Sequence, residues 1–200
     1  ALAVNAGRPD LAKACFAADS GGQLAWSVPA QQEDVLRLAL CGRVDAPGGY
    51  QPYLQLVNAG EAAYAQHDDW VRAVLHAFES FRILCAVREG EWGVAGLNTA
   101  IELRLEKEGL IRRSEWYVGR PVMVTRNDYG TGVFNGDIGL TLRDPARPGS
   151  LRVYFLEDEH VRSVLATRLR HVETAFAMTV HKSQGSEFRH TVLVLPQEGG

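Results

Sequence analysis

Three neighbouring stretches decide the fold: residues 174–180 read TAFAMTV, residues 181–188 read HKSQGSEF, and residues 191–195 read TVLVL. The first and the last are continuous apolar runs of strand length, which is typical of strands buried in a parallel sheet. The polar octet between them follows the first run directly. Because open α/β sheets bind ligands at the carboxyl ends of their strands, this octet is the first candidate site.

The chain upstream of this block alternates predicted helices with a further strand. Residues 82–87 (RILCAV) form another apolar run of strand length. We expect a helix before this run, N-capped by Asp68 or Asp69, and a second helix after it over residues 93–108. Shorter helices are predicted over residues 9–18, 31–41 and 50–59, and a strand over residues 23–28. This alternation predicts an α/β fold.

The pattern changes between residues 114 and 170, where glycines punctuate short apolar runs. Strands are predicted over residues 120–125, 139–142, 151–155 and 160–164. A stretch of this length is not an ordinary connecting loop, so we expect a small β-barrel inserted into the α/β domain. The predicted domains are residues 1–113 together with 171–200, and the insert of residues 114–170.

The composition is that of an ordinary globular protein, with 200 residues, 46% hydrophobic side chains and a net charge of −3. This charge excludes a basic nucleic-acid coat, and no apolar run reaches the roughly 20 residues of a membrane span. We expect no signal peptide. Cys15, Cys41 and Cys85 have apolar neighbours and no metal-binding spacing, so we expect buried thiols, a reducing cytoplasmic compartment and no metal site.

The octet carries side chains that suit a phosphate ligand. Lys182 supplies a point charge, and Gly185 lets backbone N–H groups approach an anion closely. Glu187 can accept a hydrogen bond from a ribose hydroxyl. The alternative is a solvated polar turn after a strand, and residue types alone favour neither interpretation.

Three stretches of the chain resemble one protein family. Residues 177–188 resemble motif V of superfamily 1 DNA helicases, in the form found in the RecD family. Residues 83–98 resemble the motif IV region of that family, and residues 116–139 resemble its SH3-like insertion. The stretches follow the family's order and cover most of residues 80–195, whereas residues 1–79 match weakly.

The resemblance implies an architecture and an activity. The chain would be the second of two RecA-like (P-loop NTPase-type) motor domains, with an inserted SH3-like β-barrel, ATP in the cleft between the domains, and single-stranded DNA across both. The implied protein is an ATP-dependent 5′→3′ DNA helicase, the α subunit of exodeoxyribonuclease V, which acts in double-strand break repair and recombination. Its implied partners are single-stranded DNA, RecB- and RecC-like subunits and an N-terminal RecA-like domain of the same polypeptide, with no membrane.

The resemblance also assigns roles to single residues. The DNA-binding candidates are Thr179, His181 and Lys182, and the nucleotide-binding candidates are Gln184, Gly185 and Glu187. Arg88 follows the motif IV strand and is the catalytic candidate, because positive charge at the γ-phosphate stabilises the transferring group. The alternatives are an Arg88 paired with Glu89 or Glu91, a structural His181 and a solvated Lys182.

The predicted insert offers further candidates. Residues that suit a DNA backbone or a stacked base are Arg120, Arg126, Asn127 and Tyr129. Alternatively, Asn127 and Asn135 only set turns, because Asn135-Gly136 is typical of a tight turn. In the motif IV region, we expect Asn98 to fix a helix or loop rather than to contact a ligand.

The sequence also lacks parts of a complete motor. It has no G-x-x-x-x-G-K-S/T phosphate loop, no Asp-Glu pair in the expected context, and no motif VI after motif V. We therefore expect a piece of a longer polypeptide, which uses ATP and Mg²⁺ when complete but by itself binds neither and is inactive. Two other functions stay open: a non-enzymatic SH3-like protein- or DNA-binding module, and a stand-alone superfamily 1 repair helicase.

Overall fold

The computed structural model describes residues 2–19, 23–27, 31–43, 48–183 and 188–196. The chain divides into two compact units, residues 1–35 and residues 36–200. The nucleotide-binding candidates Gln184, Gly185 and Glu187 lie outside the described residues. No helix in the described part of the chain is long and apolar enough to cross a membrane.

The first unit contains helices α1 (Leu2–Asn5) and α2 (Pro9–Ala17). The predicted helix over residues 9–18 is confirmed, and Pro9 stands in its first turn, where a missing N–H is tolerated. The strand predicted over residues 23–28 is wrong in its described part, which has no regular structure. The Leu24 N–H donates to the Asp19 carboxylate (2.5 Å) instead of to a neighbouring strand, so a side chain takes the place of a ladder.

The α/β part of the second unit is built on a parallel sheet in the order β7-β1-β8. Its strands are β1 (Phe81–Cys85), β7 (Ala177–Thr179) and β8 (His190–Val194). The three apolar runs predicted as strands all enter this sheet. Strand β1 pairs on both sides and is buried along its whole length. Of the run of residues 174–180, only Ala177–Thr179 enter this sheet as β7. Thr174 ends a strand of the second sheet, and Val180 already begins a short 3₁₀ helix, η2 (Val180–Ser183).

Four further helices are α3 (Gln32–Cys41), α4 (Gln51–Ala59), α5 (His67–Glu79) and α6 (Val94–Lys107). All four confirm predicted helices. The capping prediction for α5 is wrong, because Gln66 is the N-cap residue. Asp68 and Asp69 lie instead in the first turn, where carboxylates interact favourably with the helix dipole. Gly109 follows α6 with a φ of +71°, a left-handed conformation that suits a residue without Cβ.

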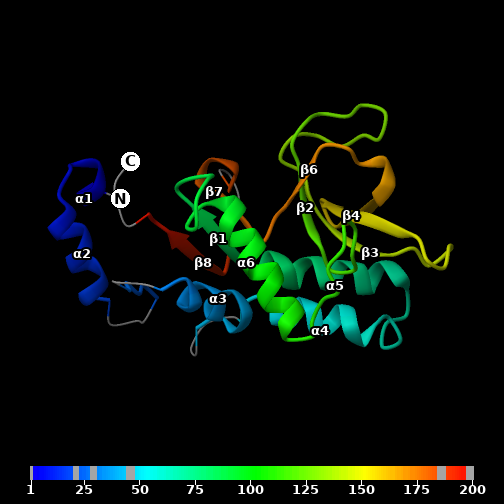
Figure 1. Ribbon diagram of the computed structural model, residues 1–200, viewed down its shortest axis with the longest axis horizontal. Coiled ribbons are helices and arrows are strands. Elements are labelled where there is room, and N and C mark those ends of the chain that lie inside the picture. The colour runs from blue at the N-terminus through cyan, green and yellow to red at the C-terminus, as the bar shows by residue number, and fades with distance from the viewer. Residues whose placement is uncertain (1, 20–22, 28–30, 44–47, 184–187, 197–200) are drawn as a thin grey trace. The chain divides into compact units, whose positions relative to one another are not determined.

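Aromatic side chains tie the helices to the parallel sheet. The centroid of the Tyr50 ring lies 5.0–6.0 Å from those of Tyr53, Phe78, Phe81 and Phe176. Tyr50, Tyr53 and Phe81 are completely buried. Helix α5 contacts β1 on this side and also strands of a second sheet (Figure 1). Helix α5 therefore contacts both sheets.

The second sheet lies between α6 and β7 in the chain (Figure 1). Its antiparallel strands, in the order β5-β4-β3-β2-β6, are β2 (Pro121–Val124), β3 (Ile138–Arg143), β4 (Leu151–Glu157), β5 (His160–Leu165) and β6 (Val172–Thr174). Four of them were predicted, whereas β6 is too short to give a strand signal. Because β6 pairs with β2, the sheet extends to Thr174, past the predicted boundary at residue 170. The pairings form a single row, and closure into a barrel stays a prediction.

The second sheet has a core of its own, made of Val122, Val124, Val133, Val153, Phe155, Val164, Ala166 and Leu169. Strands β4 and β5 meet in a two-residue turn, because Glu157 pairs with His160. Asp158 and Glu159 both have positive φ (44° and 70°), as a type I′ hairpin turn requires. This turn could not be predicted from the sequence, because neither residue is Gly or Asn.

Candidate functional site

Parallel pairing brings two predicted site segments to one edge of the first sheet. Cys85 at the end of β1 is in register with Thr179 at the end of β7. The segment after β1 carries Arg88, and the segment after β7 carries His181 and Lys182. The segment that carries Arg88 and the segment that carries His181 and Lys182 therefore follow strands that end at the edge at which open α/β sheets bind ligands.

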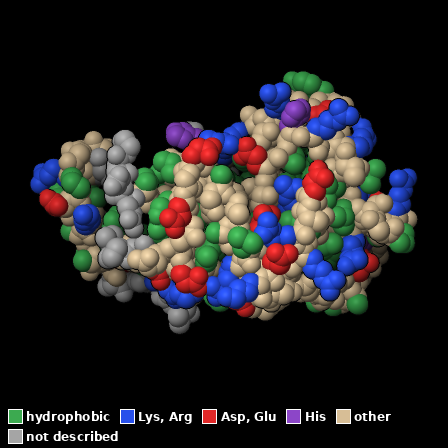
Figure 2. Space-filling model, viewed as in Figure 1, with side chains coloured by type: hydrophobic (Ala, Val, Ile, Leu, Met, Phe, Trp, Pro, Cys, Tyr) green, Lys and Arg blue, Asp and Glu red, His purple; other side chains and the backbone are tan. Residues whose placement is uncertain are grey.

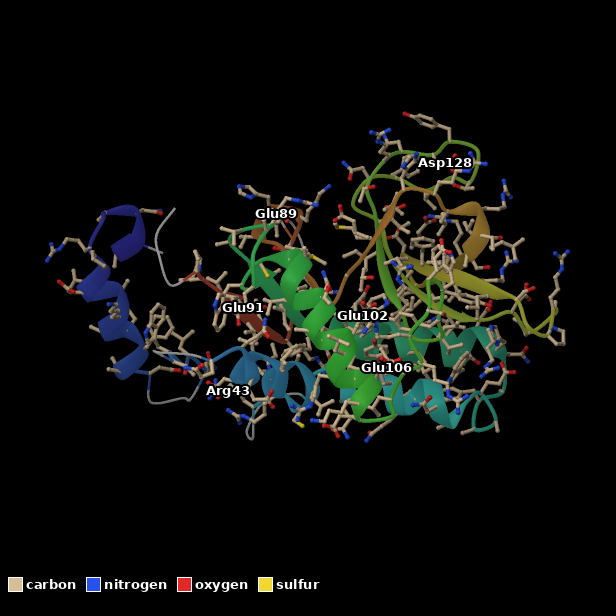
Figure 3. All side chains as sticks on the ribbon, viewed as in Figure 1. Arg43, Glu89, Glu91, Glu102, Glu106 and Asp128 are labelled. Carbon is tan, nitrogen blue, oxygen red and sulfur yellow. The ribbon has the colours of Figure 1, made fainter. Side chains whose placement is uncertain are left out.

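The loop between β1 and α6 fixes the backbone of Arg88. The Ala95 N–H, in the first turn of α6, donates to the Arg88 carbonyl at 3.1 Å. A Cβ at Gly93 would lie 2.3 Å from the Glu89 carbonyl oxygen, so only glycine fits at this close approach. Figure 3 labels Glu89 and Glu91 in this loop. The backbone that carries the Arg88 side chain is therefore held against the start of α6.

The Arg88 side chain is half-exposed and ion-paired. Its Nη2 donates to Oε1 of Glu173 at 2.8 Å, and the two side chains are 53% and 37% exposed. Glu173 lies on β6 of the second sheet. The sequence named Glu89 and Glu91 as alternative partners and missed Glu173, because nothing in a sequence relates two residues so far apart.

The described part of motif V forms η2 after β7. Lys182 Nζ donates to Oδ1 of Asn135 at 2.6 Å, and Asn135 lies in the loop between β2 and β3. The Ser183 hydroxyl donates to the Val180 carbonyl (2.8 Å), which closes the turn. His181 is exposed, and Thr179 is half-buried. His181 is therefore open to a ligand, whereas Lys182 already holds a partner.

Two buried side chains fix the start of β7. Asn98 on α6 donates from Nδ2 to the Ala177 carbonyl (3.0 Å) and accepts at Oδ1 from the Ala177 N–H (2.9 Å). The Tyr50 hydroxyl donates to the Phe176 carbonyl. Asn98 was expected to fix a helix or loop, and the structure shows that it holds a strand instead. No sequence pattern pointed to Tyr50. The strand that leads into motif V is therefore held from two elements.

Burial shifts the pKa of three groups on and around strand β1. Burial raises the pKa of Tyr50 from 10.0 to about 12 and that of Cys85 from 9.0 to about 11. Burial lowers the pKa of Arg82 on β1. Within the described residues, its Nε and Nη1 have no hydrogen-bond partner, and its guanidinium carbon lies 4.4 Å and 5.0 Å from the ring centroids of Phe78 and Phe188. Two aromatic rings thus stabilise the buried charge.

The prediction of three buried thiols is correct only for Cys85. Cys15 and Cys41 are exposed, and all three thiols are free. Cys15 lies on α2, which buries none of its residues, so apolar neighbours in sequence do not cover it. Among the described residues, no group of three or more His, Cys, Asp or Glu side chains could hold a metal ion.

Arg120 and Asn127, two candidates of the insert, make contacts within the protein. Arg120 donates from Nε to the Thr174 hydroxyl (3.1 Å) and from Nη1 to the Glu115 carbonyl (2.6 Å). Asn127 Oδ1 accepts from the Asn135 N–H at 2.8 Å, in the predicted turn. The alternative that Asn127 sets a turn therefore agrees with the structure.

Tyr129 and Phe134 form an exposed aromatic pair on the loop between β2 and β3. Tyr129 is 81% exposed, and the two rings meet edge-on with centroids 6.0 Å apart. Asp128, labelled in Figure 3, marks this loop, and basic side chains gather at the same end of the second sheet in Figure 2. This end of the insert is open to a ligand that stacks on a ring.

Known proteins match parts of this chain. Residues 97–155 match the family described as the ATP-dependent RecD-like DNA helicase SH3 domain. The RecBCD enzyme subunit RecD of Haemophilus influenzae is 42% identical over 132 residues, which cover 64% of this chain and 19% of that protein. The same subunit of Mycobacterium tuberculosis is 41% identical over 139 residues, or 69% of this chain and 23% of that protein. The chain spans about a fifth of the length of these curated relatives.

Two more distant proteins are also similar. The ATP-dependent RecD2 DNA helicase of Deinococcus radiodurans is 32% identical over 117 residues, which cover 57% of this chain and 16% of that protein. A crystal structure of Bacteroides Pif1 bound to single-stranded DNA matches with a TM-score of 0.33 and 20% identity, over 56% of this chain and 34% of that chain. At this TM-score, the likeness carries no argument about the fold.

The sequence matches define a class: the chain is similar to RecD-like DNA helicases and carries the SH3-type domain of that class. Within the class, the chain resembles the C-terminal portion of RecD, the subunit of the RecBCD enzyme. The resemblance that motifs IV and V suggest is therefore confirmed.

Proposed function

We propose that the chain is part of the ATP-driven motor of a RecD-type 5′→3′ DNA helicase, the α subunit of exodeoxyribonuclease V. The observation that carries the proposal is the convergence of Arg88, His181 and Lys182 at the carboxyl edge of one parallel sheet. In this proposal, residues 1–113 and 171–200 form the second RecA-like domain. Residues 114–170 then form the SH3-like barrel, with β6 as its last strand.

The nucleotide would bind at the end of β1. An exposed guanidinium on a fixed backbone suits a phosphate, so we assign Arg88 to the γ-phosphate of ATP. Gln184, Gly185 and Glu187 would line the same nucleotide. In this proposal, the Mg²⁺ ion and the phosphate loop belong to the N-terminal RecA-like domain, because the given sequence has no G-x-x-x-x-G-K-S/T loop. This chain alone would then bind neither ATP nor Mg²⁺ and would not turn over ATP.

The DNA strand would bind at the end of β7, where Thr179, His181 and Lys182 would contact it. Because β1 and β7 are neighbours in register, nucleotide and DNA would meet the same sheet edge. A change in one ligand would then alter the contacts of the other, which is the coupling that a translocating motor needs. We also propose that the full-length protein binds RecB- and RecC-like subunits, acts in double-strand break repair and is cytoplasmic.

The experiment that tests this function uses the full-length helicase. Gln184→Ala or Glu187→Ala should reduce DNA-stimulated ATP hydrolysis while the far-UV circular dichroism stays unchanged. Gln66→Ala is a matched control, because Gln66 caps α5 without a side-chain bond. Unchanged ATP turnover in both motif V variants would contradict the assignment.

A second candidate is a stand-alone repair helicase without partner subunits. The similarity to the Deinococcus radiodurans RecD2 helicase favours it. Purification of the tagged full-length protein separates the two, since an α subunit should retain RecB- and RecC-like chains. A non-enzymatic binding module would show no DNA-stimulated ATP turnover at full length.

A further inference from the structure

Both described cations of the candidate site are held by the second sheet. Glu173 on β6 accepts from Arg88 at 2.8 Å, and Asn135 in the β2–β3 loop accepts from Lys182 at 2.6 Å. These two acceptors come from different segments, yet each contacts a positively charged side chain at the same edge of the parallel sheet. The contacts therefore connect the insert to both candidate ligand sites.

The two acceptors are attached to one strand. Glu173 is in register with Met123 on β2. The N–H of Gly136, the neighbour of Asn135, donates to the Val124 carbonyl at the end of β2 (2.8 Å). The insert thus presents both acceptors from one hydrogen-bonded framework, and a shift of that framework would affect both contacts.

We propose that Glu173 and Asn135 are positioning residues that hold Arg88 and Lys182 away from their ligands. ATP phosphate would displace Glu173 from Arg88, and a DNA phosphate would displace Asn135 from Lys182. The insert would then compete with each ligand for its cation. This inference rests on the proposed function, because it takes Arg88 and Lys182 as ligand contacts.

The strength of the contacts suits such an exchange. Arg88 and Glu173 are both partly exposed, and a pair of this kind shifts an equilibrium by only about two- to fivefold. The γ-phosphate of ATP carries more negative charge than a carboxylate, and its oxygens accept charge-assisted hydrogen bonds. The neutral Asn135 amide is a weaker acceptor for an ammonium than an anionic DNA phosphate. Each ligand can therefore replace the insert at its cation.

The test uses the full-length helicase and two variants. Glu173→Gln keeps the size of the side chain but removes its charge, and should lower the KM for ATP about two- to fivefold with little change in single-strand affinity. Asn135→Ala should instead tighten single-stranded DNA binding without lowering the KM for ATP. Glu157→Gln is the matched control, because it removes another Arg–Glu pair of the insert, with Arg162 at 2.7 Å. It should change neither quantity.

A double variant separates this inference from the proposed function. In an Arg88→Gln background, Glu173→Gln should no longer lower the KM, because its effect acts through Arg88. An unchanged or raised KM in Glu173→Gln alone, beside a slow Arg88→Gln enzyme, would overturn the inference and leave the proposed function standing. An Arg88→Gln enzyme with normal turnover would overturn both.

Discussion

Asn98 on α6 and Ala177 at the start of β7 exchange two hydrogen bonds, from Nδ2 to the carbonyl (3.0 Å) and from the N–H to Oδ1 (2.9 Å). Among the described strands, β7 lies at an edge of its sheet, since the order is β7-β1-β8. The Asn98 side-chain amide therefore pairs with the outward-facing N–H and carbonyl of Ala177, as the backbone of a neighbouring strand would. Because Asn98 is buried, no water replaces it readily, and α6 and the strand before motif V are held together.

The first prediction concerns this pair. Asn98→Ala leaves the Ala177 N–H and carbonyl without their partner in a buried place, so we expect the free energy of unfolding to fall by about 2–3 kcal/mol. Urea denaturation measures this change. Thr99→Ala on the same helix removes an exposed hydroxyl bond to Ala95 (3.1 Å) and should change stability by less than about 0.5 kcal/mol. Equal losses in the two variants would show that the pair does not stabilise the fold.

The Tyr50 hydroxyl gives a second, pH-dependent prediction. Burial raises its pKa from 10.0 to about 12, so the folded state favours the neutral phenol. The contribution of the neutral Tyr50 phenol to the free energy of unfolding is complete below pH 10 and is lost as the pH rises toward 12. Wild type should therefore lose about 2 kcal/mol more than Tyr50→Phe over this interval. Urea denaturation of both proteins at pH 10 and at pH 12 measures the difference. Equal losses of unfolding free energy in wild type and in Tyr50→Phe would contradict the prediction.

Thiol reactivity tests the placement of the three cysteines. Cys15 and Cys41 are exposed, whereas burial raises the pKa of Cys85 to about 11 and keeps its reactive thiolate scarce. A chromogenic disulfide reagent should therefore modify two thiols quickly in the native protein and the third only after unfolding. The double variant Cys15→Ser with Cys41→Ser should show no fast phase. Three fast thiols in wild type would disprove the buried position of Cys85.

A binding measurement tests the assignment of His181. In the full-length helicase, His181→Ala should weaken single-stranded DNA binding about two- to tenfold, the value of one hydrogen bond, and leave the KM for ATP unchanged. His160→Ala, which removes an exposed histidine from β5, is the control. A loss of nucleotide binding as large as the loss of DNA binding would argue for a structural histidine.

The parallel sheet could be predicted because each of its strands is a continuous apolar run. The same reasoning failed at residues 23–27, the described part of the predicted strand over residues 23–28, which pairs with no described strand and where the Leu24 N–H donates to Asp19 instead. It also missed β6, whose three residues form a strand only because β2 lies beside them. A strand without an apolar run depends on its neighbours, and a sequence does not show which neighbours it has.

The candidate site was predictable to the level of segments and not of contacts. The sequence places Arg88 and Lys182 each shortly after a predicted strand, and the parallel pairing of those strands brings their carboxyl ends to one edge. Their partners Glu173 and Asn135 could not be predicted, because each contact joins residues far apart in the chain across two sheets. Tyr50 was missed for the same reason, since its partner Phe176 belongs to a distant segment.

The measurement that tests the central claim most directly is DNA-stimulated ATP turnover by the full-length helicase with Arg88→Gln. If Arg88 stabilises the transferring γ-phosphate, turnover should fall by about 10²–10³-fold with the fold intact. Arg104→Gln on α6 is the matched control, because it removes an exposed pair with Glu108 (2.8 Å) and should turn over ATP like wild type. An Arg88→Gln enzyme as active as that control would contradict the account.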